Sequence, residues 1–323
     1  MIPPVHVILN PAAGGGEGRR ARPEIERELG FLRVPFTIEE TDRPGHAIEL
    51  AAAAAASGAG TVIAAGGDGT VHEVVNGLLR DAAPGATAGR PVLGVIPVGT
   101  GNDLVKVVAG SADRRKAYEV LGAGAIRRFD VGRAEWEGGA EYFVNGLGTG
   151  VDVEVVRQIR RLPRLPGVLS YLVGLLRALV RFEPIPLRVR MDGERIQRKV
   201  MIIAVGNGCC LGGGFYICPG AEPDDGRLDV CIVNELNVFQ IARVLPRVLR
   251  GTHAGMPEVT LRRATSIEIA ASGDSPLFFQ VDGELREPPD ARELRVSLER
   301  AILPVLAAPV TVDAAHAVSG GIE

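Results

Sequence analysis

The chain has 323 residues, of which 46% are hydrophobic and 23% are charged, and its formal net charge at pH 7 is −3. This length is sufficient for two domains with separate cores, and the composition is globular rather than disordered. The small negative charge gives no general case for nucleic-acid binding, so no nucleic-acid partner is expected.

The chain begins with Met1-Ile-Pro-Pro, which lacks the basic region and the long apolar run of a signal peptide. No uncharged apolar stretch reaches the ~18 residues that a membrane span requires. We therefore expect a cytoplasmic protein.

The first ~105 residues repeat one arrangement four times: an apolar strand, a glycine-containing polar loop and a helix pattern. The four strands are expected at residues 5–9, 36–40, 61–65 and 92–96. In an open parallel α/β sheet such loops all emerge at the carboxyl edge, where ligands bind. The loops have neither Walker A nor GxGxxG spacing. We therefore expect them to face one nucleotide and to hold it by a different scheme.

The third loop, Gly66-Gly67-Asp68-Gly69-Thr70, lies between a buried-strand pattern and a helix pattern. Its glycines let a ligand approach the backbone, and the helix that follows presents unpaired N–H groups to an anion, most plausibly a phosphate. Asp68 is suited to organise a cation, a water or a hydroxyl. The pattern favours phosphoryl chemistry, and its alternative is a tight turn in which Asp68 or Thr70 caps the helix.

After a polar helical connection, short alternating runs separated by turn residues are typical of antiparallel sheet. We expect an N-terminal α/β domain over residues 1–126, rejoined by residues 300–323, and a β-rich domain over 127–299 with a helical insertion at 153–182. The runs lie at residues 129–134, 141–145, 187–191, 200–205, 228–233, 266–270 and 277–281.

Residues 157–182 carry six arginines and no acid beside many leucines, and residues 238–250 are similar but shorter. Such a segment can lie on an anionic membrane surface or line an entry path for a lipid. The alternative is a core helix with a solvated basic flank.

Motifs along nearly the whole chain resemble those of the bacterial diacylglycerol kinase and lipid kinase family, which is related to sphingosine kinases and NAD kinases. GGDGT at 66–70 and GTGND at 99–103 carry the resemblance in the first half. The remaining motifs are Asn10-Pro11, Pro44-Gly45-His46, NGLGTG at 145–150, VGNG at 205–208, DDGRLD at 224–229 and Asp282-Gly283-Glu284.

The resemblance implies an NAD kinase-like nucleotide domain, a C-terminal antiparallel β-sandwich and an active site in the cleft between them. It implies a structural Mg²⁺ held by Asp225 and by the backbone carbonyls of Glu222 and Arg227. The residues that it implies for ATP binding are Asn10, Thr41, Gly66, Gly67, Asp68, Gly69, Thr70, Val71, His72 and Thr100.

The resemblance also makes Glu284 the acceptor of the lipid hydroxyl proton. In the related sphingosine kinases the aspartate of the glycine-rich loop is the proposed base, so Asp68 is a rival. The chain contains a second DGE, Asp192-Gly193-Glu194, between two strand patterns, and this one is expected to be a plain hairpin turn.

The resulting prediction is an ATP- and Mg²⁺-dependent lipid kinase, acting as a peripheral protein at the inner membrane face with diacylglycerol as the leading substrate. The alternatives are an NAD kinase-like enzyme with a soluble substrate and a non-catalytic nucleotide- or lipid-binding regulator. Exposed sheet edges permit a homodimer without requiring one.

Overall fold

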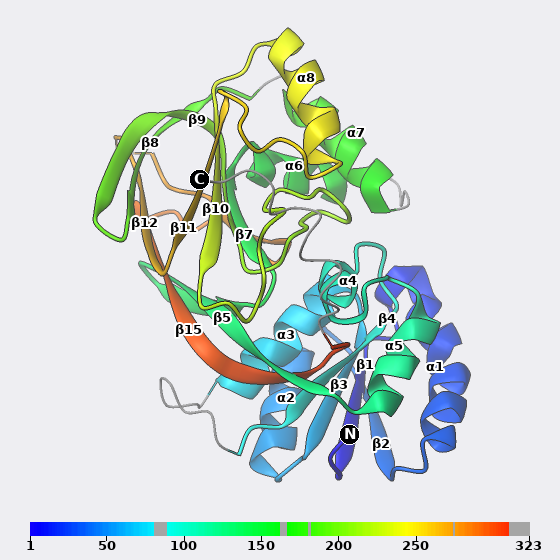
Figure 1. Cartoon of the computed structure of the whole chain (residues 1–323). Coiled ribbons are helices and arrows are strands. Elements are labelled where there is room, and N and C mark those ends of the chain that lie inside the picture. The colour runs from blue at the N-terminus through cyan, green and yellow to red at the C-terminus, as the bar shows by residue number, and fades with distance from the viewer. Residues whose placement is uncertain (81–88, 162–166, 180–181, 274, 310–323) are drawn as a thin grey trace. The chain divides into compact units, whose positions relative to one another are not determined.

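A computed structural model describes residues 1–80, 89–161, 167–179, 182–273 and 275–309 of the chain (Figure 1). These residues form two compact units. Unit 1 consists of the described residues before 130 and after 302, and unit 2 consists of residues 130–302. Among the described residues, no helix is long and apolar enough to cross a membrane.

Unit 1 is built on a parallel sheet in the order β2-β1-β3-β4, and the end of the last strand, β15 (Glu293–Leu306), adds beside β4 through Val305 and Leu93. Every residue of β3 and β4 is buried, as expected for central strands covered on both faces. All four strands predicted for this half are confirmed: β1 (Val5–Leu9), β2 (Phe36–Glu40), β3 (Thr61–Gly66) and β4 (Val92–Pro97).

Helices cover both faces of this sheet, with α2 and α3 on one side and α1 and α5 on the other (Figure 1). Apolar side chains of α1 and α5, among them Ile25, Leu29 and Leu121, complete the core against the strands. The helices are α1 (Ala13–Phe31), α2 (His46–Ala56), α3 (Asp68–Leu79), α4 (Asp103–Ala109) and α5 (Arg114–Ala123).

Unit 2 is mainly antiparallel, with the strand order β14-β13-β7-β9-β8-β12-β15. β10 pairs with β9 and β11, and β5 pairs with β6 and β15. The parallel α/β sheet followed by an antiparallel β unit confirms the predicted fold class. The strands are β5 (Ile126–Trp136), β6 (Gly139–Phe143), β7 (Gly146–Gly150), β8 (Ile185–Met191), β9 (Glu194–Gly206), β10 (Leu228–Asn234), β11 (Val259–Ala264), β12 (Ser266–Ala271), β13 (Phe279–Val281) and β14 (Glu284–Arg286).

The predicted helical insertion contains two helices, α6 (Val151–Arg160) and α7 (Gly167–Leu179). Valines of α6 are buried, and its Arg157 and Arg160, which belong to the basic segment 157–182, pair with Glu287 and Glu284. Two of the six arginines, at 164 and 181, lie outside the described residues. The shorter basic segment is helix α8 (Val238–Val248).

Candidate active site

In unit 1, the loops that follow β1, β3 and β4 touch one another through their backbones. A methyl group added at Gly99 would lie 2.4 Å from the Cα atom of Gly67, and one added at Gly14 would lie 2.4 Å from the carbonyl oxygen of Val98. Only residues without a Cβ allow this approach. The predicted convergence of these three loops at the carboxyl edge of the sheet is therefore confirmed.

Asp68 joins the loop after β3 to the start of α4. Its Oδ2 accepts the N–H of Asn102 at 2.8 Å and its Oδ1 accepts the N–H of Asp103 at 2.7 Å. Burial, and secondly the negative charge of Asp103, raise the pKa of the Asp68 carboxyl to about 6, although these two N–H groups and Lys106 act in the opposite direction. Asp68 thus has a structural role in holding the GTGND loop.

Asn10 and Thr70 connect the first loop to the third. The side-chain amide of Asn10 donates to the Thr70 hydroxyl at 3.0 Å, while its Oδ1 accepts the N–H of Ala12 at 3.0 Å. A methyl group at Gly66 would lie 2.3 Å from the same hydroxyl, so the turn closes only around a glycine. These contacts fix the loop whose N–H groups are predicted to meet phosphate.

The loop after β2, which contains Pro44-Gly45-His46, is held by Glu73 of α3, to which the sequence analysis assigned no role. Its carboxylate accepts the N–H of Gly45 at 2.8 Å and that of Ala47 at 3.2 Å at the start of α2. This is a favourable place for an anion because the N-terminal N–H groups of a helix lack partners within the helix. Glu73 therefore brings the Pro44-Gly45-His46 loop against α3.

The other predicted nucleotide residues differ in exposure. The side chains of Val71 and His72 are buried in α3, so any contact with a nucleotide would use their backbone. Thr100 is exposed and Thr41 is half-buried. The backbone N–H of Thr41 donates to the carbonyl of Leu9 at 2.9 Å, which places Thr41 at the end of the sheet.

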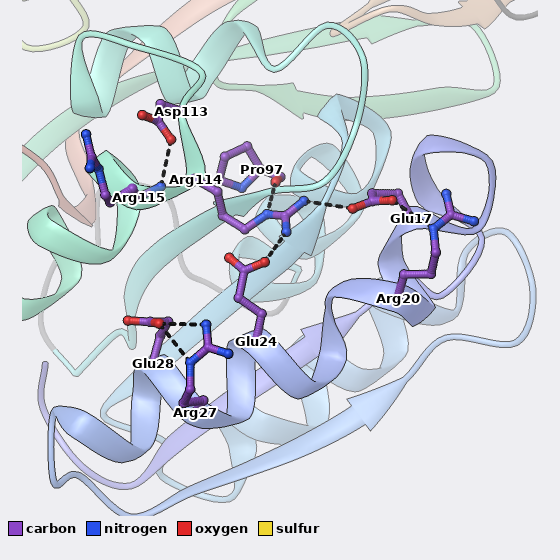
Figure 2. Close-up of polar contacts among 9 residues, drawn as sticks. All are labelled: Glu17, Arg20, Glu24, Arg27, Glu28, Pro97, Asp113, Arg114 and Arg115. Atoms are coloured by element: carbon purple, nitrogen blue, oxygen red, sulfur yellow. Dashed lines mark hydrogen bonds and ion pairs between the residues drawn. The ribbon is translucent and has the colours of Figure 1, made fainter.

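An arginine of α5 braces the first and fourth loops from outside (Figure 2). Arg114 donates to the carbonyl of Pro97 at 3.2 Å, to Glu24 at 2.6 Å and to Glu17 at 3.4 Å. Pro97 ends β4 directly before the GTGND loop, and Glu17 follows the glycines of the first loop. Arg27 and Glu28, in the same view, form an exposed pair on α1 that touches neither loop.

In unit 2, both DGE sequences form the same two-residue hairpin turn. Asp192 and Gly193 have φ of 44° and 100°, and Asp282 and Gly283 have φ of 48° and 86°. Glu194 and Glu284 each start the second strand of their hairpin, opposite Met191 and Val281. The hairpin predicted at 192–193 is confirmed, and backbone geometry alone does not distinguish the two glutamates.

The two aspartates differ in what they hold. The buried Asp282 carboxylate accepts the N–H groups of Val144, Asn145 and Gly146 at 3.1, 3.0 and 2.9 Å, whereas the more exposed Asp192 accepts those of Thr265 and Ser266. Asn207 donates from its side chain to the carbonyls of Asp130 and Val144. Three motifs of the resemblance, NGLGTG, VGNG and Asp282-Gly283-Glu284, thus meet at the segment 144–146.

Helix α6 also fixes the turn that precedes Glu284. The buried Gln280 accepts the N–H of Gly283 at 2.6 Å and donates to Asp152 of α6 at 2.8 Å. Burial raises the pKa of the Asp152 carboxyl to about 6. Arg160 of the same helix lies 3.2 Å from Glu284, whose side chain is 40% exposed. Sequence reasoning missed Asp152 and Gln280 because neither belongs to a motif.

The implied Mg²⁺ site lies before β10. Among the described residues no group of three or more metal-binding side chains occurs, but the implied set needs only the Asp225 carboxylate and two carbonyls. Burial raises the pKa of Asp225, and it raises that of the nearby Asp229 to about 6. Oδ2 of Asp229 is buried and has no hydrogen-bond partner among the described residues. Such an oxygen beside a second carboxylate is of the kind that a hard divalent cation binds, while the Arg263 guanidinium, 3.5 Å from Asp229 and 3.8 Å from Asp225, supplies positive charge to the same pair.

Two family profiles match the chain. Residues 4–134 match the diacylglycerol kinase catalytic domain, and residues 145–306 match the YegS C-terminal NAD kinase beta sandwich-like domain.

Curated relatives named diacylglycerol kinase include one from Staphylococcus saprophyticus, 28% identical over 86% of this chain and 88% of its own length. Another, from Bacillus subtilis strain 168, is 29% identical over 86% of this chain and 88% of its own length. One from Mycobacterium tuberculosis is 29% identical over 88% of this chain and 89% of its own length. A crystal structure of a candidate diacylglycerol kinase from Bacillus anthracis strain Sterne is 26% identical, covers 94% of this chain and 95% of its own, and has a TM-score of 0.77.

Proposed function

The chain belongs to the diacylglycerol kinase family, and from this premise we propose that it transfers the γ-phosphate of ATP to the hydroxyl group of a lipid, with diacylglycerol as the leading acceptor. The observation that carries the proposal is the convergence of three glycine-rich loops through Gly67, Gly99 and Gly14. Phosphoryl transfer requires mainly positioning and electrostatic stabilisation, and a rigid group of backbone N–H donors at the carboxyl edge of a sheet supplies both.

Within this proposal, unit 1 binds ATP through the loops at 10–16, 41–46, 66–72 and 99–103. Asn10, Thr70 and Asp68 hold these loops in position by the hydrogen bonds described above. Lys106, 2.9 Å from Asp103, is one cation of this region that could neutralise phosphate charge. A divalent cation, when bound with ATP, supplies the remaining charge neutralisation.

Glu284 is the better candidate for the proton acceptor. Both carboxylate oxygens of Asp68 already accept backbone N–H groups, so a change at Asp68 would disturb α4 whatever its chemical role. Glu284 is partly exposed, pairs with Arg160 and follows a turn that Asp282 and Gln280 hold rigidly. A carboxylate oriented in this way can take the hydroxyl proton as the phosphoryl group is transferred.

The second DGE provides a matched control for the test. Glu284→Gln and Glu194→Gln make the same substitution at the same position of two equivalent hairpins. Labelled γ-phosphate transfer from ATP would be measured with Mg²⁺ in mixed micelles of diacylglycerol, phosphatidylglycerol or a sphingoid base, and with NAD in solution. Loss of a general base costs about 10²- to 10⁴-fold in rate, so we expect Glu284→Gln to lose this much and Glu194→Gln to match the wild type.

ATP binding by Glu284→Gln should remain unchanged, which separates loss of chemistry from loss of the nucleotide site. Equal activity in Glu284→Gln and the wild type would exclude Glu284 as the base and return the role to Asp68. Phosphate transfer to NAD alone would replace the lipid kinase proposal with the soluble-substrate alternative, and ATP binding without transfer to any acceptor would support the regulator.

A further inference from the structure

Helix α8 of unit 2 presents two large apolar side chains to solvent. Val238 is 77% exposed and Phe239 is 87% exposed, the highest values among the large hydrophobic residues described. They occupy the first turn of the helix, which a capping box between Asn237 and Gln240 closes. Because this turn is capped, the exposure belongs to an ordered helix end and not to a fraying terminus.

The opposite face of α8 packs on the protein. Val244 is buried in a cluster with residues of β9, β10 and β11, and Val248 packs against the same cluster. An ordinary surface helix turns only polar residues to solvent, whereas the outward face of α8 carries apolar residues as well as cations. Single exposed apolar residues need no explanation, but two neighbours on a rigid helix end, beside a basic surface, do.

Arginines continue the outward face beyond Phe239. Phe239, Arg243, Pro246 and Arg250 are exposed and spaced at helical intervals, and Arg247 is exposed beside them. Arg243 is paired with the buried Glu258. From residue 234 to residue 250 the sequence contains one acid, Glu235, against three arginines. The outward face of α8 is thus apolar at its start, and Arg247 and Arg250, the second of which follows the end of the helix, make it positively charged at the other end.

The chain offers a contrasting surface at Phe31, in unit 1. Phe31 is 72% exposed, but it lines a groove of about 470 Å³ whose charged residues are Glu24, Glu28, Glu119 and Arg115. The charged side chains of this groove have no excess of cations, whereas Arg247 and Arg250 at α8 attract an anionic surface. Two exposed phenylalanines therefore differ mainly in the sign of their surroundings.

We propose that the outward face of α8 docks on an anionic phospholipid bilayer, with Val238 and Phe239 entering the headgroup and acyl boundary and Arg247 and Arg250 meeting the lipid phosphates. The inference rests on the proposed lipid kinase function, because diacylglycerol lies in the bilayer and an enzyme that phosphorylates it must bind the membrane surface. The strength of interfacial binding increases with the apolar area buried and with electrostatic attraction to anionic lipids, and this face of α8 offers both.

Vesicle flotation, which needs no catalytic turnover, tests the docking directly. The full-length protein would be floated with phosphatidylcholine vesicles with and without phosphatidylglycerol. We expect the wild type to bind the anionic vesicles more strongly and to lose this preference at high salt. Phe239→Ser should weaken binding about tenfold, because burial of a large apolar side chain is removed. Arg247→Glu combined with Arg250→Glu should weaken it at least about tenfold.

Phe31→Ser is the matched control for the apolar substitution, Arg27→Glu is the matched control for Arg247→Glu alone, and both controls should float like the wild type. Arg27 lies on α1, where its partner is Glu28 (Figure 2). Flotation of Phe239→Ser at the wild-type level, or equal losses in the controls, would overturn the proposal. So would binding of the wild type to neither kind of vesicle.

Activity in detergent micelles separates this inference from the proposed function. A variant that floats poorly but phosphorylates micellar diacylglycerol at the wild-type rate assigns α8 to docking alone. If the wild type labels no lipid in micelles, the kinase proposal fails, while flotation still decides whether α8 binds membranes.

Discussion

Asp68 and Asp282 are the acidic residues of two glycine-rich motifs, and both direct their carboxylates at backbone N–H groups of another loop. Hydrogen bonds to a charged acceptor are stronger than neutral ones, and losing such an acceptor leaves buried donors unpaired. Substitution of either aspartate would therefore disturb a loop as well as any chemistry. A loss of activity on mutating Asp68 would not by itself identify a general base.

Asp152 allows a prediction about stability and pH. Its carboxyl has a pKa of about 6 in the folded chain because it is buried, against ~3.9 for an ordinary aspartate. The folded state thus binds this proton more tightly than the unfolded state, and the resulting stability is present below about pH 4 and lost as the pH rises through 6. We expect Asp152→Asn to gain up to about 3 kcal/mol relative to the wild type between pH 4 and pH 8.

Urea unfolding of both proteins at pH 4 and pH 8 measures this difference, and Asp290→Asn, at an exposed site, should change the free energy of unfolding by less than about 0.5 kcal/mol at either pH. A difference between Asp152→Asn and the wild type that stays the same at the two pH values would contradict the raised pKa. Asparagine keeps an oxygen that can accept the N–H of Gln280, so the comparison isolates the charge.

At the level of elements, two loops of unit 1 approach each other so closely that no side chain fits between them. The loops after β3 and β4 meet at Gly67 and Gly99, and Arg114 of α5 braces the end of β4 from outside. The distance between these two loops, which belong to the predicted nucleotide site, is therefore set by backbone contact between two glycines. Loop spacing should therefore control nucleotide affinity.

Gly99→Ala tests this expectation. The new methyl group would lie 2.4 Å from the Cα atom of Gly67, so the two loops must separate. Gly30→Ala is the control, because Gly30 lies in α1 with nothing within 4 Å of the added methyl group. We expect Gly99→Ala to weaken ATP binding at least about tenfold in calorimetric titration, whereas Gly30→Ala should bind normally and be more stable by up to about 1 kcal/mol. Unchanged affinity in Gly99→Ala would show that loop spacing does not set nucleotide binding.

For the whole molecule, each unit has a core of its own. Ile25, Ile63 and Ile96 belong to the core of unit 1, and Phe143, Ile203 and Phe279 to that of unit 2. The chain passes between the units in β5 and β15, each of which has residues in both. Two cores of this kind give two potential unfolding transitions.

The single tryptophan makes the two transitions separable. Trp136 packs edge-on against Phe279 in unit 2, with ring centroids 5.1 Å apart. An ATP analogue that binds unit 1, added at a concentration of 100 times its Kd, should raise the free energy of unfolding of that unit by about 2.7 kcal/mol. We expect calorimetry to show one transition moving to higher temperature with the ATP analogue while the transition reported by Trp136 fluorescence stays in place. A parallel shift of the two would show that the units unfold together.

Secondary structure in the first half could be read from the sequence almost residue by residue. Buried parallel strands are short apolar runs, and glycine-rich loops interrupt them, so 5–9, 36–40, 61–65 and 92–96 are visible as local patterns. In unit 2 the seven predicted runs all lie within or overlap strands, but β7 was not predicted as a strand, because Gly146-Leu-Gly-Thr-Gly150 has no alternating pattern. This glycine-rich strand forms only because β9 and β13 pair with both of its edges.

Local chemistry in the sequence therefore determined the fold class and the glycine-rich loops, whereas the resemblance to the lipid kinase family supplied most candidate residues of the site. The tertiary structure alone decided which partners these side chains bind. Asp68 accepts hydrogen bonds from the start of α4, Glu73 from the start of α2 and Asp282 from the segment 144–146, while Gln280 bonds to both Asp152 and Gly283. It also decided that α8 turns Phe239 outward while α6 turns its valines inward. The reason is that propensity and periodicity act over a few neighbouring residues, whereas hydrogen bonds and burial depend on segments that lie far apart in the chain and meet only after folding.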